Sequence, residues 1–546
     1  MGRFGFWITE ETELPGEILQ SIEEDRLVLF VGAGVSMASP SYLPSFEDLV
    51  KQICQNTNHS GFLTPGRKKL NKREKDSLGL DGILGIIKDS MGDVGNTLHN
   101  EIFNILKTAF EENRINNTHK AIVDLANASP TVRIVTTNQD RLLECDLLYA
   151  SYEKPLVYDA PALPDGSDFR GIVNLHGSIS IPEKMIFSDS DFGEAYLTKQ
   201  YCARFLTELF SKFTVLFVGY SHDDPLMKYH ARGLGECERF ILTHDISNPK
   251  WNTLGIRTIH YRKTHKPDVH SEVPRILYAI SEYIKMSPGD KRNKLKSIAI
   301  AGPQDFLNNE MSLIREVLLD TSDDTYESLK YFLDNANDYK WYDFLENDDV
   351  LRDHNIIQAV FGVDAYDART NIVTEWFLKV CFCIGDEEAV SFGFGKLSRT
   401  HHKWNEGFIT NVISIIADGQ ISQVASEKLC LLCAGRLRGF SNKLELAYYL
   451  EKLSIRSHWS LVKAILEELA FPIPKLEKSW RFHSDGGYDQ FDIVPYTPAG
   501  DETMVDWYLK EWWNKRDVSY IDCYEEIVAC FSQNLEKMLN YFGIEQ

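Results

Sequence analysis

Features of exported and membrane proteins are missing from this sequence. No apolar run reaches the ~18 residues that a membrane-spanning helix needs. The N-terminal stretch MGRFGFWITEETELPGE is acidic and lacks the apolar core of a secretory signal. Phe6 also stands where N-myristoylation after Gly2 favours Ser or Thr. We therefore expect a cytoplasmic protein with reduced thiols and no membrane partner.

Positive charge is in short supply. The 546 residues include 58 Lys and Arg but 80 Asp and Glu, which gives a formal net charge of -22. A negative field repels phosphate backbones, so we expect no nucleic-acid partner. The basic run from Arg67 to Lys75 is interpreted as a solvated loop face.

Paired cysteines are also scarce. Ten cysteines are scattered along the chain, and only Cys430 and Cys433 form a Cys-x-x-Cys motif. These two lie in an apolar helical pattern, where cysteine behaves as a small hydrophobic residue. Structural zinc needs four ligands, and the sequence offers no second pair. We therefore expect no metal.

The first half of the chain contains short, nearly continuously apolar runs separated by helical patterns. Such runs are typical of parallel strands that are covered on both faces, because half-exposed strands alternate with polar residues. Strand-helix alternation favours a Rossmann-like, doubly wound parallel α/β sheet. The expected strands are residues 27–31, 132–136, 171–175, 214–218, 239–243 and 256–259, and helical patterns include 45–55 and 140–150.

The composition changes near Lys285, where a polar segment with Pro and Gly is interpreted as a linker. Beyond it the apolar residues recur at helical spacing, except for a Gly- and Pro-rich stretch at 480–501 that we expect to be a loop. The prediction is a domain at 1–286, a linker at 287–297 and an α-helical domain at 298–546. The aromatic residues of the last part are interpreted as core rather than interface anchors: Trp341, Tyr342, Trp376, Trp404, Trp459 and Trp480.

Two of the predicted strands end in motifs suited to a nucleotide. Gly32, Ala33 and Gly34 follow the first strand, where small residues let the backbone approach a pyrophosphate. Ser36 is a candidate phosphate ligand or a helix cap. After the next strand, Asn138 can orient a ribose hydroxyl or a water. Taken singly, the glycine motif is equally compatible with a tight turn that binds nothing, and the Asn138 motif favours a polar capping turn.

Two further strands end in a similar way. His176, followed by Gly177, can act as a general base near neutral pH, although a lone His is more often structural. Gly219, Tyr220 and Ser221 suit the ribose and adenine side of a dinucleotide. The alternative for this last segment is a plain strand-helix connection, with Asp224 as the N-cap and Pro225 at the first helical position.

The order of these motifs resembles the NAD-binding core of the sirtuins over about residues 10–285. The resemblance implies that NAD+ binds at the strand ends and that Asn138 and His176 are catalytic. It also implies a set of NAD-binding residues: Gly32, Ala33, Gly34, Ser36, Thr137, Asp140, Gly219, Tyr220 and Ser221.

The sequence departs from the sirtuin deacylases at their zinc module and at the loop after the glycines. Between residues 140 and 240 the cysteines are Cys145, Cys202 and Cys237, which form no Cys-x-x-Cys pair. Ser45 and Glu47 replace an Asp and an Arg of the deacylases, and Thr137 stands where they usually have Gln.

The whole pattern is more similar to the bacterial defence-associated sirtuins, which join a zinc-less sirtuin domain to a helical sensing region. That resemblance implies an NAD+ glycohydrolase that depletes cellular NAD in anti-phage abortive infection. It also implies a homo-oligomer and a phage protein or accessory defence protein that acts through the helical half. The alternatives are a non-catalytic sensor of NAD or ADP-ribose and an NAD-dependent protein deacylase.

Overall fold

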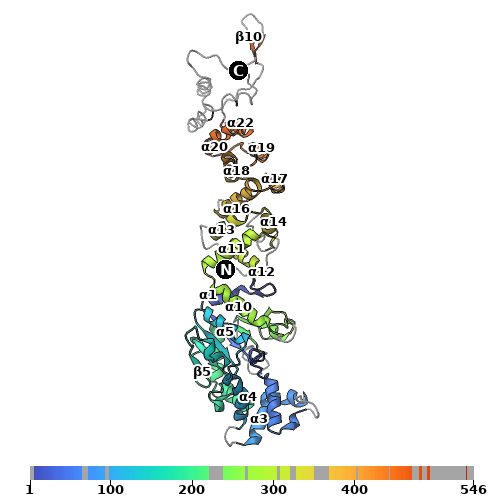
Figure 1. Cartoon of the computed structure of the whole chain (residues 1–546), viewed down its shortest axis with the longest axis vertical. Helices are drawn as coiled ribbons and strands as arrows, with labels where there is room; N and C mark the ends of the chain where they lie inside the picture. The colour runs from blue at the N-terminus through green and yellow to red at the C-terminus, as the bar shows by residue number, and fades with distance from the viewer. Residues whose placement is uncertain are drawn as a thin grey trace. The chain divides into compact units, whose positions relative to one another are not determined.

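The computed structural model divides the chain into two compact units (Figure 1). One comprises Met1–Lys291 with Leu307–Ser312, and the other comprises Arg292–Phe306 with Leu313–Gln546. The structure describes residues 5–63, 72–92, 97–220, 238–264, 269–303, 308–319, 327–349, 368–400, 404–441, 443–469, 479–482, 488–491, 530 and 537. No helix in these ranges is long and apolar enough to cross a membrane.

A seven-stranded sheet forms the centre of the first unit, with the strand order β5-β6-β4-β3-β7-β8-β9. All neighbouring strands in it are parallel, which confirms the predicted sheet. The strands are β3 (Leu27–Val31), β4 (Arg133–Thr136), β5 (Val157–Asp159), β6 (Gly171–Asn174), β7 (Thr214–Val218), β8 (Arg239–Thr243) and β9 (Arg257–His260). Six of them lie where the sequence predicts strands, and the short edge strand β5 was not predicted. A separate antiparallel pair joins β1 (Phe6–Trp7) and β2 (Glu13–Leu14).

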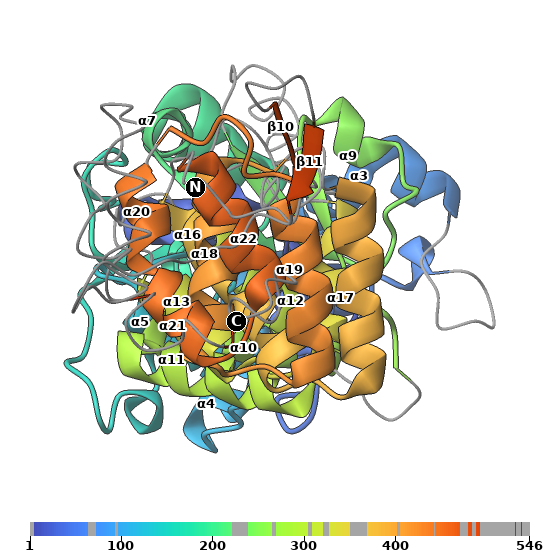
Figure 2. The same cartoon turned by 90° about the horizontal axis from the view of Figure 1, so that it is seen from above.

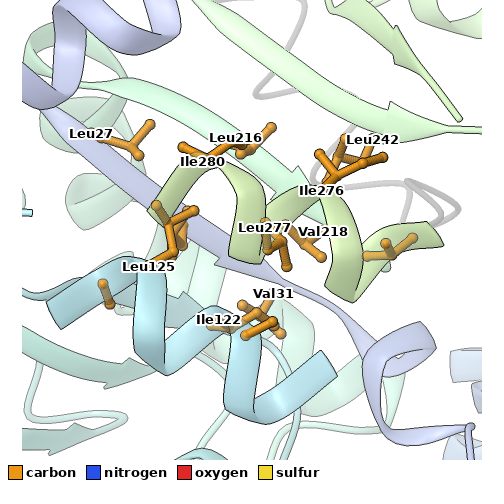
Figure 3. Packing of buried hydrophobic residues seen from close by; sticks show 14 of the residues in the cluster. Leu27, Val31, Ile122, Leu125, Leu216, Val218, Leu242, Ile276, Leu277 and Ile280 are labelled. Carbon is orange, nitrogen blue, oxygen red and sulfur yellow. The ribbon is translucent and has the colours of Figure 1, made fainter. Parts of the chain in front are cut away.

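Helices cover both faces of the sheet, which explains why its strands are apolar throughout. Along β3, Leu27, Leu29 and Val31 face one cluster, whereas Val28 and Phe30 face the other. On the first face lie α1 (Gly16–Glu23), α5 (Asn117–Ala128) and α10 (Glu272–Lys285), and α7 (Tyr201–Lys212) covers the second. Figure 3 shows the packing of α5 and α10 on the sheet through Ile122, Leu125, Ile276, Leu277 and Ile280.

Three helices between β3 and β4 have a hydrophobic core of their own. They are α2 (Phe46–Asn56), α3 (Lys72–Met91) and α4 (Thr97–Glu111). Helix α2 confirms the helix predicted for 45–55, and Ser45 caps it by accepting a hydrogen bond from the Asp48 amide at 3.1 Å. Met185 and Phe187, which follow β6, complete this third core.

The helix predicted for 140–150 is wrong. This segment forms two 3-10 turns, η3 (Leu142–Glu144) and η4 (Asp146–Leu148). Arg141 adopts a left-handed conformation with φ 58°, and the Leu142 amide donates to Asp140 Oδ1 at 2.9 Å. This local bond from a side chain to the backbone competes with an α-helix. The remaining short elements of the unit are η1 (Ala33–Ser36), η2 (Ser60–Phe62), η5 (Pro182–Lys184), α6 (Asp189–Phe192), the π-helical turn η6 (Gly193–Thr198) and α9 (Lys250–Thr253).

Residues 287–297 were predicted to be a linker, and from Pro288 onward they form part of helix α11 (Pro288–Ala301). Ser287 accepts a hydrogen bond from the Asp290 amide at 3.1 Å, and the Ser287 amide donates to Asp290 Oδ2 at 3.1 Å. Together with Pro288 at the first helical position, this exchange starts a helix. The Pro and Gly therefore mark a helix start, and the division between the two units falls within α11.

The second unit is mainly helical, as predicted. Its helices are α12 (Asn308–Leu319, which enters this unit at Leu313), α13 (Glu327–Asn335), α14 (Lys340–Asn347), α16 (Ala368–Leu378), α17 (Glu387–Thr400), α18 (Glu406–Asp418), α19 (Gln423–Ala434), α20 (Lys443–Tyr448), α21 (Leu450–Ile455) and α22 (Trp459–Glu468), with a π-helical turn η8 (Lys379–Cys383) after α16. Helix α19 packs against α18 and α22 (Figure 2). Part of the predicted loop at 480–501 instead forms an antiparallel hairpin of β10 (Ser479–Phe482) and β11 (Tyr488–Phe491), whose aromatic residues favour strands.

The core interpretation of the aromatic residues is confirmed for all but one of them. Trp341, Tyr342, Trp376, Trp404 and Trp459 are buried. The indoles of Trp341 and Trp376 donate to Ala299 O and Ala336 O at 3.1 and 2.7 Å. The Trp480 side chain lies outside the described residues.

Candidate functional site

The four predicted motifs meet at one edge of the sheet. The register aligns Asp159, Asn174, Thr136, Val31 and Val218 across β5, β6, β4, β3 and β7. The motifs follow the last four of these residues directly. Strand β3 is the first of this sheet in the chain, and it has β4 on one side and β7 on the other. Open α/β sheets bind ligands at such a switch of strand order, beyond the carboxyl ends of the strands.

The turn after β3 packs backbone against backbone with the turn after β7. The amides of Gly32 and Gly34 donate to Val218 O and Gly219 O at 3.0 and 2.9 Å. A Cβ atom on either Gly32 or Gly34 would lie 2.7 Å from Gly219 O, and Gly219 itself has φ 64°. These glycines are therefore required by contact within the protein, whatever they do for a pyrophosphate. Ala33 and Gly34 are exposed.

Ser36 is the centre of a buried hydrogen-bond network. Its hydroxyl donates to Asp140 Oδ2 at 2.7 Å and accepts from Asn138 Nδ2 at 3.3 Å. It also lies 3.1 Å from Nε2 of His119, whose Nδ1 accepts from the Asn116 amide at 3.3 Å. Because Nδ1 accepts, the ring proton is on Nε2, and His119 donates to Ser36. One donor and two acceptor positions of the hydroxyl are thus all used.

Burial controls the charges in this network. Burial lowers the pKa of His119 to about 3, so its imidazole is neutral at pH 7. Burial also raises the pKa of Asp140, against the opposing hydrogen bonds from Leu142 and Ser36. Ser36 was a candidate phosphate ligand, but its hydroxyl already binds three protein groups. Contact between Ser36 and a phosphate would require this network to change.

Asn138 presents a buried acceptor that is not used. Its Nδ2 donates to Gly32 O at 3.2 Å, which fixes the amide because a carbonyl oxygen only accepts. Its backbone amide donates to Thr136 Oγ1 at 3.0 Å. Its Oδ1 is buried and has no hydrogen-bond partner among the residues that the structure describes. An unpaired buried acceptor costs about 1–3 kcal/mol, so this oxygen is suited to a donor from a ligand or a water.

His176 follows β6, the strand that pairs with β4, which Asn138 follows. Each is two residues beyond the aligned pair Thr136 and Asn174. His176 is 6% exposed, and its Nε2 lies 2.9 Å from the Tyr196 hydroxyl. Burial lowers the pKa of His176 to about 3, far below the value expected for a base poised near neutrality. The imidazole is therefore neutral at pH 7.

Gly177 has φ 73°, and a Cβ atom there would lie 2.8 Å from Lys184 O. The sharp turn after His176 therefore needs glycine.

The remaining predicted residues contribute in different ways. Thr137 is half-buried, and its amide donates to Val31 O at 3.2 Å. The Tyr220 ring packs on Phe30 and Phe217, with ring centroids 5.4 and 5.8 Å apart, so it belongs partly to the core. Ser221 lies outside the described residues, as do Asp224 and Pro225.

A second buried network ties the ends of β4, β5 and β6 together. Asn174 Nδ2 donates to Glu144 Oε1 at 2.7 Å and to Asp159 Oδ1 at 3.0 Å. Arg141 donates to Glu144 Oε2 at 2.9 and 2.8 Å, and its guanidinium lies over the Phe110 ring at 5.0 Å. This arrangement fixes the chain directly before His176. It also supplies the partners that the buried Glu144 carboxylate needs.

Sequence reasoning missed His119 and Tyr196. The only local signal for His119 is Asn116 three residues earlier, a capping pair that starts α5. The signal for Tyr196 is Phe192 four residues earlier, which places both rings on one helical face. Neither signal indicates that these side chains contact Ser36 or His176.

The cysteines of this unit are packed as isolated residues. Cys145 donates to Asn113 Oδ1 at 2.8 Å, and Cys202 donates to Leu175 O at 3.3 Å. Cys237 lies outside the described residues. Within the part of the chain that is described, no three His, Cys, Asp or Glu side chains are grouped to hold a metal ion.

Comparison with known proteins gives two matches. Residues 132–240 match the family model described as SIR2-like domain, a range that includes Asn138, Asp140 and His176. The uncharacterized protein y4cA of Sinorhizobium fredii (strain NBRC 101917 / NGR234) is 22% identical over 398 residues, which cover 67% of this chain. The chain spans 30% of the length of that relative. The family match supports a sirtuin-like domain in the first half of the chain and an activity that involves NAD+.

Proposed function

We propose that this chain is an NAD+ hydrolase that cleaves the bond between nicotinamide and ribose and releases nicotinamide and ADP-ribose. The observation that carries the proposal is the unpaired, buried Oδ1 of Asn138. Asn138 contacts the glycine turn and follows the strand next to the one that His176 follows, at the edge of the sheet where dinucleotides bind. An acceptor held in this way can bind a ribose hydroxyl or the attacking water.

The proposed reaction requires no proton transfer from the protein to the leaving group. Nicotinamide departs as a neutral base, so no general acid is needed. The transition state resembles an oxocarbenium ion, as in other glycosyl transfers. The main tasks are to hold the ribose and to place a water, and we assign both to Asn138. The Ser36–Asp140 pair holds Asn138, and the exposed turn at Ala33 and Gly34 lets the pyrophosphate approach the backbone, where we assign the Ala33 amide as its donor.

His176 is the proposed base, acting on the water directly or through a ribose hydroxyl. General-base catalysis contributes about 10²–10⁴-fold, and it is most effective when the pKa lies near the working pH. Because burial lowers the pKa of His176 to about 3, we assign it the lower end of that range, about 10²-fold. The proposed adenosine end of the site consists of Gly219, Tyr220 and Ser221, with Thr137 near the ribose.

We further propose that the hydrolase depletes NAD in anti-phage abortive infection. The sequence lacks the paired cysteines of a deacylase zinc module, and a helical unit follows the sirtuin-like part. In this proposal the helical unit recognises a phage protein or an accessory defence protein, or mediates self-assembly into a homo-oligomer. The protein acts in the cytoplasm, where NAD is available.

The test is to incubate the purified full-length chain with NAD+ and to quantify nicotinamide and ADP-ribose by chromatography. The incubation is repeated with lysate from phage-infected and from uninfected cells, and an acetyl-lysine peptide is added in a separate arm. Equal amounts of both products without the peptide support the hydrolase. Release that requires the peptide supports the deacylase alternative. Binding of NAD+ or ADP-ribose without any release supports the sensor alternative and refutes the hydrolase.

A further inference from the structure

Tyr196 is the polar neighbour of His176. Its hydroxyl lies 2.9 Å from His176 Nε2, and its side chain is buried at 2% exposure. The rings of Phe192 and Tyr196 both face the imidazole edge-on, with centroids 5.2 and 6.0 Å from it. The two aromatic residues are four positions apart, so one helical face encloses the ring of His176.

The segment that carries Tyr196 is held firmly in place. It begins with α6, where Ser188 and Asp191 form a reciprocal capping pair. Lys88 of α3 donates to Asp191 Oδ1 at 2.7 Å, which ties the start of α6 to the helical module between β3 and β4. Tyr196 itself lies in the π-helical turn η6. Single π-helical turns of this kind are rare and occur frequently at functional sites.

The geometry distinguishes the two nitrogens of His176. Nε2 is engaged with Tyr196, whereas the described part of the chain offers no hydrogen-bond partner to Nδ1. Nδ1 is therefore the nitrogen that remains for a ligand. A neutral imidazole carries one proton, and only the nitrogen without it can act as a base. If Nδ1 is the base, the proton is on Nε2, and the Tyr196 oxygen accepts it in a hydrogen bond.

We propose that Tyr196 is a positioning residue, which accepts a hydrogen bond from Nε2–H of His176 and so holds the tautomer in which Nδ1 is basic. This inference rests on the proposed NAD+ hydrolysis. In the reaction Nδ1 takes the proton that the water or ribose hydroxyl loses, and the Nε2–H bond to Tyr196 is retained by the imidazolium. The hydroxyl also restricts the rotation of the ring, because it holds Nε2 in a defined hydrogen bond and leaves Nδ1 for the ligand.

The kinetic test compares two substitutions that each remove one buried hydroxyl. Tyr196→Phe keeps the ring contacts and removes the bond to His176. Tyr149→Phe is the matched control, because that hydroxyl donates to Leu143 O at 3.0 Å and its side chain is 5% exposed. This hydrogen bond strengthens as His176 becomes an imidazolium, so its loss predicts a fall in kcat of about tenfold for Tyr196→Phe, with KM for NAD+ nearly unchanged. Tyr149→Phe should retain the kcat of the unsubstituted chain.

The second test is independent of activity. Nitrogen-15 NMR of histidine-labelled full-length protein, with the His176 signals assigned by His176→Gln, reports which ring nitrogen carries the proton. We expect the Nε2–H tautomer in the unsubstituted chain and a mixture of tautomers in Tyr196→Phe. An Nδ1–H tautomer in the unsubstituted chain, or an unchanged kcat in folded Tyr196→Phe, would overturn the inference. If the unsubstituted chain cleaves no NAD+, the hydrolase proposal fails, and the tautomer still decides the role of Tyr196.

Discussion

Acid should destabilise the sirtuin-like unit through two buried imidazoles. Burial lowers the pKa of both His119 and His176 from 6.5 to about 3. Between these values the unfolded chain binds a proton at each site and the folded chain does not. The stability that the two neutral imidazoles provide is therefore fully present above pH 6.5, and it is lost as the pH falls from there toward 3.

The size of the effect follows from the width of this window. One pKa unit corresponds to about 1.4 kcal/mol. Between pH 7 and pH 5 each imidazole removes about 2 kcal/mol from the free energy of unfolding, and both together remove about 4 kcal/mol. Because folded domains are stable by about 5–15 kcal/mol, such a loss is large. The raised pKa of Asp140 acts in the opposite direction, since its protonation favours the folded state as the pH falls.

Urea unfolding at pH 7 and pH 5, followed by hydrogen exchange of peptides from β3 and β4, measures this change in the relevant unit. His176→Gln removes one of the two titrating groups without altering the network around Asp140. Between pH 7 and pH 5 the free energy of unfolding of His176→Gln should therefore fall by about 2 kcal/mol less than that of the unsubstituted chain. A substituted chain with the same pH dependence as the unsubstituted one would show that His176 is not a buried neutral imidazole.

Further substitutions and assays test the rest of the site. Asn138→Ala should lower the rate of NAD+ cleavage by about 10²-fold or more, because a misplaced water loses the benefit of proximity. The NAD+ affinity, measured by calorimetry, should change less. Loss of binding with unchanged turnover of bound NAD+ would show that Asn138 is only a binding residue. Gly34→Ala should destabilise the first unit by about 1–3 kcal/mol in thermal unfolding, because the added Cβ would lie 2.7 Å from Gly219 O. Gly61→Ala is the control, because a Cβ atom at Gly61 meets no other atom of the described residues within 4 Å. Elemental analysis should find no stoichiometric zinc, and chelators should leave the unfolding temperature unchanged; one tightly bound zinc per chain would revive the deacylase alternative. Lysate from phage-infected cells should raise the rate of nicotinamide release by the full-length chain, and equal rates with infected and uninfected lysate would argue against control by a phage component.

The parts of the fold that sequence reasoning predicted depend on local patterns. Strand β3 is apolar along its whole length and is buried on both faces, so its pattern alone identifies a covered parallel strand. The meeting of the motifs at one sheet edge also follows from the parallel arrangement, because strands that run the same way end at the same edge. The segment expected to be a linker at 287–297 is helical because Ser287, Pro288 and Asp290 start a helix, although Pro and Gly also mark loops.

The site itself was only partly predictable. Asn138 and His176 could be chosen as candidates because they follow closely after predicted strands. The role of His119 could not, because its partner Ser36 is 83 residues away in the chain and the contact exists only once α5 packs beside the glycine turn. Tyr196 is hidden for the same reason, since a π-helical turn has no sequence pattern that reveals which side chain it presents to His176.

The contact between the glycine turn and Gly219 has a consequence for how this sequence can evolve. Where two side chains touch, a larger residue on one side can be balanced by a smaller residue on the other. At Gly34 the touching atoms all belong to the backbone, and at Gly32 and Gly219 backbone atoms lie as close as the nearest side-chain atom, so a smaller neighbouring side chain would not remove the clash. A larger residue at one of these positions therefore cannot be compensated by a smaller side chain at a neighbouring position. In diverged descendants of this protein the three glycines should be retained together, or be lost together with the close approach of the two turns.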